Sequence, residues 1–131
     1  MQSSAVQVIR SIGSVSAGYL ILALTNMAYV VMWYVNPVAD WSPTIIIAAS
    51  VPFTFVCSLI GGYACGWVAG RSEMLHAVVL AGIMTAITIA NIVLAVAVEP
   101  TEYKIVYLVT MVAGTLFGAS RSARKAKAAR S

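Results

Sequence analysis

Four long apolar stretches follow one another along the chain, separated by short polar segments. Each has about the 20 residues or more that a helix needs to cross the hydrocarbon core of a bilayer. Proline disfavours helix in the residue before it, so Asn36-Pro37 and Glu99-Pro100 are expected to end the first and third stretches. The pattern predicts an all-α integral membrane bundle of four transmembrane helices with short loops. The expected spans are 14–35, 43–70, 73–98 and 102–120, with Ser42, Ser72 and Thr101 as helix caps.

The composition supports this class of protein. The chain has 131 residues, of which 61% are hydrophobic and 9% are charged, whereas soluble domains carry about 25% charged residues. So few charges leave too little polar surface to cover a globule in water. We expect a single transmembrane domain over residues 1–131.

The placement of the basic residues predicts the orientation of the four spans. Threading the chain through a membrane puts Arg10, Arg71 and the basic segment 121–131 on one side, and leaves Lys104 as the only basic residue on the other. Basic residues accumulate on the cytoplasmic side of membrane proteins. Both termini are therefore expected in the cytoplasm, and the bacterial inner membrane is the expected location.

The basic segment also suggests a contact surface. It carries five cations: Arg121, Arg124, Lys125, Lys127 and Arg130. Because it directly follows a membrane span, anionic lipid head groups or an acidic face of a partner are the expected contacts, and nucleic acid is not.

Small residues recur at every fourth position of the second span, at Thr54, Ser58, Gly62, Gly66 and Gly70, and again in the fourth span at Thr110, Gly114 and Gly118. Residues four apart share one face of a helix, and small ones allow the backbones of two helices to approach closely in lipid. This pattern predicts glycine-zipper packing of these spans, on each other or on a partner. An alternative is a narrow path lined by small residues, beside the helix kink expected at Pro52.

Two asparagines and one histidine are the remaining candidates for a site. Asn26 and Asn91 are expected to be buried polar groups, like Thr54, either bonding across the bundle or forming a polar site. His76 could be an axial ligand to a haem or chlorophyll-type ring, although no second histidine is present. The simpler interpretation is an interfacial histidine, and no cofactor is predicted.

Enzyme chemistry is not expected. No acidic residue lies at depth in any span, whereas ion-coupled transport and embedded acid–base chemistry usually need one. The small multidrug resistance transporters carry such a glutamate in their first helix, and the first span here has none. Cys57 and Cys65 are eight residues apart in one span, roughly 12 Å along a helix, which is too far for a disulfide. No catalytic or metal-binding set is predicted.

The sequence therefore predicts a non-catalytic role, as an accessory or scaffold subunit of a larger membrane complex such as a respiratory or photosynthetic one. Two alternatives remain open. The first is a small homo-oligomeric channel or transporter for a neutral or anionic solute, with Asn26, Asn91, Thr54 and Ser58 along its path. The second is a pigment- or haem-binding subunit with His76 as ligand.

Overall fold

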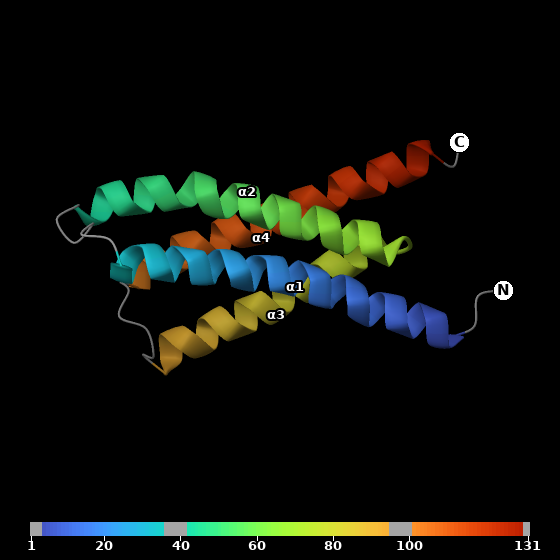
Figure 1. The fold of residues 1–131 in the computed structure, drawn as a ribbon, viewed down its shortest axis with the longest axis horizontal. Coiled ribbons are helices and arrows are strands. Elements are labelled where there is room, and N and C mark those ends of the chain that lie inside the picture. The colour runs from blue at the N-terminus through green and yellow to red at the C-terminus, as the bar shows by residue number, and fades with distance from the viewer. Residues whose placement is uncertain (1–3, 36–41, 95–100, 130–131) are drawn as a thin grey trace.

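The computed structural model describes residues 4–35, 42–94 and 101–129, and this part of the chain is all-α (Figure 1). It contains four helices: α1 (Ser4–Val35), α2 (Pro43–Ala69), α3 (Glu73–Val93) and α4 (Thr101–Ala128). Each is long and apolar enough to cross a membrane. The prediction of four transmembrane-length helices is therefore confirmed.

Two of the helices extend beyond the apolar stretches. α1 begins ten residues before the predicted start of the first span, and α4 continues past the fourth span to Ala128. Apolar length indicates where a helix can cross a membrane, but not where the helix ends. Alanine, lysine and arginine are good helix formers, so the basic segment propagates α4. The predicted end of the third span at residue 98 lies outside the described residues.

A tight connection joins α2 to α3. Gly70 ends α2 with φ +61°, and its N–H donates to the Gly66 carbonyl at 3.2 Å. Ser72 is also left-handed, with φ 55°, which costs free energy for a residue with a Cβ. Ser42 and Ser72 occupy the N-cap positions of α2 and α3, yet neither side chain makes a capping hydrogen bond. α4 begins at Thr101, so Thr101 is its first helical residue and not its cap.

The helices run alternately up and down, so that both chain termini lie at the same end of the molecule (Figure 1). We call this end, which also holds the α2–α3 connection, the basic end. α2 lies at the centre of the arrangement, with its most extensive contacts to α4 and the next to α1. α1 and α3 cross and then separate toward the opposite end, where both helices finish (Figure 1).

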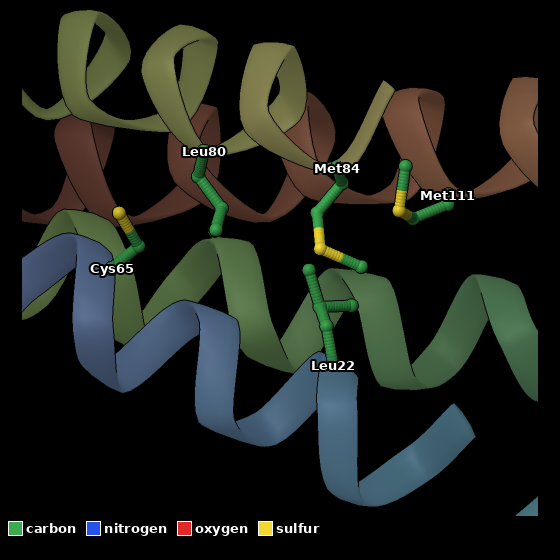
Figure 2. Packing of buried hydrophobic residues seen from close by; sticks show 5 residues of the cluster. All are labelled: Leu22, Cys65, Leu80, Met84 and Met111. Carbon is green, nitrogen blue, oxygen red and sulfur yellow. The ribbon is translucent and has the colours of Figure 1, made fainter. Parts of the chain in front are cut away.

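A small core joins all four helices (Figure 2). Its buried side chains are Leu22 from α1, Cys65 from α2, Leu80 and Met84 from α3, and Met111 from α4. Many large aliphatic side chains instead face outward, such as Leu24, which is 65% exposed. This distribution suits helices whose outer solvent is lipid.

Candidate functional site

α2 and α4 meet along a seam where backbone lies against backbone. A Cβ placed on Gly62 would clash with the backbone of Thr115, and one on Gly118 would clash with the Leu59 carbonyl oxygen. Only glycine allows so close an approach. The small-residue faces of α2 and α4 thus pack on each other within one chain.

The seam continues in both directions from these glycines. A Cβ on Gly114 would lie 2.7 Å from the Ser58 Cβ. The buried Ser58 hydroxyl donates to the carbonyl of Thr54, itself buried, at 2.6 Å. Toward the basic end, a Cβ on Gly66 would lie 3.0 Å from the Ser122 Cβ.

Three threonine hydroxyls on α1 and α3 bond to the backbone of their own helix. Thr25 donates to the Ile21 carbonyl at 2.7 Å, Thr85 to the Ala81 carbonyl at 2.7 Å, and Thr88 to the Met84 carbonyl at 2.9 Å. A hydroxyl bonded in this way needs no partner from outside the helix. These threonines are therefore compatible with an apolar environment.

Asn26 and Asn91 differ from the expectation that they are buried, because both are exposed on the surface of the chain. Asn26 follows Leu22 by four residues on the inward stripe of α1, and Asn91 follows Thr88 by three on that of α3. α1 and α3 separate toward the ends of the helices that carry these residues (Figure 1). Within the described part of the chain, neither amide forms a hydrogen bond.

The four residues expected along a solute path do not lie together. Thr54 and Ser58 are buried in the α2–α4 seam, whereas Asn26 on α1 and Asn91 on α3 are exposed. Pro52 is exposed, and α2 is continuous through it.

His76 lies in the first turn of α3 and is partly exposed. Its Nδ1 is 2.9 Å from the Ser72 carbonyl oxygen, the geometry of an Nδ1–H donor. With Nδ1 bonded, Nε2 is the ring nitrogen left for another contact. The described residues contain no cluster of three or more His, Cys, Asp or Glu side chains that could hold a metal ion.

The basic side chains near the end of α4 are exposed and project from a continuous helix. Arg121, Arg124, Lys125 and Lys127 are exposed, and the Arg121 guanidinium lies 5.0 Å from the centre of the Phe117 ring. Arg130 lies outside the described residues. These cations therefore project from a helix that packs on α2.

A groove at the basic end was not expected from the sequence. It has a volume of about 270 Å³ and lies between the end of α2, the start of α3 and the basic part of α4. Gly66 and Gly70 form its α2 side together with Tyr63 and Trp67, and α3 contributes Glu73. Ser122 and Lys125 line it from α4. Sequence reasoning missed it because its residues come from three helices that only the fold brings together.

Comparison with known protein families, with curated proteins and with solved structures finds no match to this chain.

Proposed function

We propose that this protein is a non-catalytic accessory subunit that binds a larger membrane protein through the face formed by α1 and α3. In this proposal the four helices span the bacterial inner membrane, and the basic end, with both termini, lies in the cytoplasm. The observation that carries it is the exposure of Asn26 and Asn91 within apolar helices.

An amide without a hydrogen-bond partner is costly to place against lipid acyl chains. The threonine hydroxyls of these helices are satisfied by their own backbone, but a carboxamide has two donors and an acceptor to satisfy. A polar group on a neighbouring membrane helix would supply the missing partners. The two amides therefore favour a protein neighbour over lipid along this face.

The α2–α4 seam supports the same assignment by elimination. Gly62 and Gly118 are occupied by contacts within the chain, so that seam offers no surface to a partner. The polar side chains that remain exposed to a partner, Asn26 and Asn91, lie on the α1–α3 face.

The test is purification of the tagged full-length chain from its native membrane in mild detergent, followed by mass spectrometry. We expect a larger subunit in stoichiometric amount. Interhelical hydrogen bonds in membranes average about 0.6 kcal/mol, so the double variant Asn26→Leu/Asn91→Leu should weaken the association roughly 10-fold.

The matched control is Met27→Leu/Ile89→Leu, which changes exposed apolar residues on the same helices and should leave the association intact. A lone monomer or homo-oligomer in mild detergent would count against the proposal, and so would a double asparagine variant that binds as tightly as the wild type. A visible absorption spectrum of the same sample, compared with that of His76→Ala, tests for a bound pigment.

A further inference from the structure

We propose that the groove at the basic end binds the head group of a phospholipid that carries both a phosphate and a primary amine. The groove lies where α2 and α4 leave the apolar spans and where α3 begins. In a membrane this is the level of the lipid head groups. The inference is independent of the accessory role, because the groove lies at the other end of the molecule from Asn26 and Asn91.

The size of the groove fits a head group. Its volume is about 270 Å³. A phosphoethanolamine group is smaller than that. Gly66 helps to keep this space open, because a Cβ on it would lie 3.0 Å from the Ser122 Cβ and 3.4 Å from the Glu73 Cβ.

The positive charge of the groove matches a phosphate. Lys125 lines it from α4. The guanidinium of Arg10 lies against the backbone of Gly70, because a Cβ on Gly70 would be 3.0 Å from one of its terminal nitrogens. The Lys125 ammonium can donate to phosphate oxygens, and the Arg10 guanidinium lies next to the groove at Gly70, outside the residues that line it.

The single carboxylate selects the rest of the head group. Glu73 lines the groove together with Lys125, yet the described residues show no ion pair between the two. A purely anionic head group would leave Glu73 facing a like charge. A primary ammonium would instead donate hydrogen bonds to the carboxylate, which a quaternary ammonium, having no N–H, cannot do.

The fluorescence of Trp67 can report which lipid lies beside the groove. It lines the groove and is 71% exposed, and replacing Trp33 and Trp41 by Phe leaves it as the only tryptophan of the chain. The full-length protein is reconstituted in phosphatidylcholine vesicles with a minor fraction of a test lipid brominated near the top of its acyl chains. Quenching of Trp67 then compares phosphatidylethanolamine, phosphatidylglycerol and phosphatidylcholine as test lipids.

We expect phosphatidylethanolamine to be enriched near Trp67 by about 3-fold to 5-fold over the other two lipids, the factor that one partly exposed ion pair supplies. Glu73→Gln should abolish its advantage over phosphatidylglycerol, and Lys125→Gln should reduce the enrichment. Lys127→Gln, which removes the same charge outside the groove, and Glu102→Gln, at the opposite end, should change nothing.

Equal quenching by all three lipids would overturn the proposal, since it would show ordinary annular lipid. A preference for phosphatidylglycerol would show that Glu73 does not select the head group. Anionic lipids would then be attracted only by the positive charge of the basic end. The wild-type lipid series decides the matter even if a variant fails to fold.

Discussion

The α2–α4 seam makes a quantitative prediction, because its glycines differ in what a methyl group would meet. Gly118→Ala places a Cβ against the backbone of Leu59 and within 2.8 Å of the Tyr63 nitrogen. A backbone inside a helix cannot move aside by changing rotamer, so the two helices must separate. Overpacking of this kind typically costs 1–3 kcal/mol, and we expect about 3 kcal/mol of lost stability here. Gly62→Ala should behave like it, since its Cβ would meet the backbone of Thr115.

Other glycines of the chain serve as internal controls. Gly13 and Gly82 are helical and have nothing within 4 Å of the position of a Cβ. Alanine there should be neutral, or should stabilise the helix by up to about 1 kcal/mol through its higher helix propensity. Replacing glycine by alanine is thus expected to lower the free energy of unfolding in the seam and to leave it unchanged or raise it at Gly13 and Gly82.

Gly114→Ala should lie between these extremes and should be partly reversible. Its Cβ would lie 2.7 Å from the Ser58 Cβ, a side-chain atom, and 2.9 Å from the Phe55 carbonyl oxygen. Adding Ser58→Gly removes the first contact and leaves the second. We therefore expect Gly114→Ala/Ser58→Gly to recover part of the stability lost in Gly114→Ala.

The assay is reversible unfolding in mixed micelles with increasing dodecyl sulfate, followed by circular dichroism and by the fluorescence of Trp67. The free energies of unfolding of the variants are compared at one micelle composition. If Gly118→Ala and Gly82→Ala shift the stability equally, within about 0.5 kcal/mol, the seam does not hold the bundle together and the reasoning is refuted.

Three further predictions concern single positions. Thr115 is fully buried, and its hydroxyl has no hydrogen-bond partner among the described residues. Thr115→Val should therefore raise the free energy of unfolding by about 1 kcal/mol. Thr88→Val removes a hydroxyl that is hydrogen-bonded, so it should not raise the free energy of unfolding in the same assay. Ser72 has φ 55°, so Ser72→Gly should stabilise the α2–α3 connection by about 0.5–1 kcal/mol, seen as a higher melting temperature that Ser72→Ala does not produce. A C-terminal green fluorescent protein should fluoresce and a C-terminal alkaline phosphatase should be inactive if the basic end is cytoplasmic; the opposite pair of results would reverse the proposed orientation.

The sequence was sufficient to predict the helices because a bilayer imposes a minimum length of apolar residues on each span. It also indicated which faces of α2 and α4 could approach closely, since small residues at every fourth position have few other uses in a membrane. It left open whether Gly62 and Gly118 contact each other's helices or a partner. That depends on how four helices are arranged, which no local pattern encodes.

The asparagines show where the pattern was misleading. Asn26 and Asn91 continue the stripes on which Leu22 and Thr88 are buried, so helical periodicity alone predicts burial for them as well. α1 and α3 separate toward the ends that carry these two residues (Figure 1), and helical periodicity does not encode how two helices cross. The groove around Glu73 and Lys125 escaped prediction for a related reason, because these residues are fifty-two positions apart in the chain.

The continuity of α4 has a mechanical consequence. The same helix that packs in the seam at Gly118 carries the exposed cations Arg124 and Lys127, with no break before Ala128. Because α4 is continuous over this length, a rotation of α4 against α2 would turn these charges through the same angle. Charges on a flexible tail would not follow such a rotation. A change in how α4 packs in the seam would therefore displace the exposed cations of the basic end.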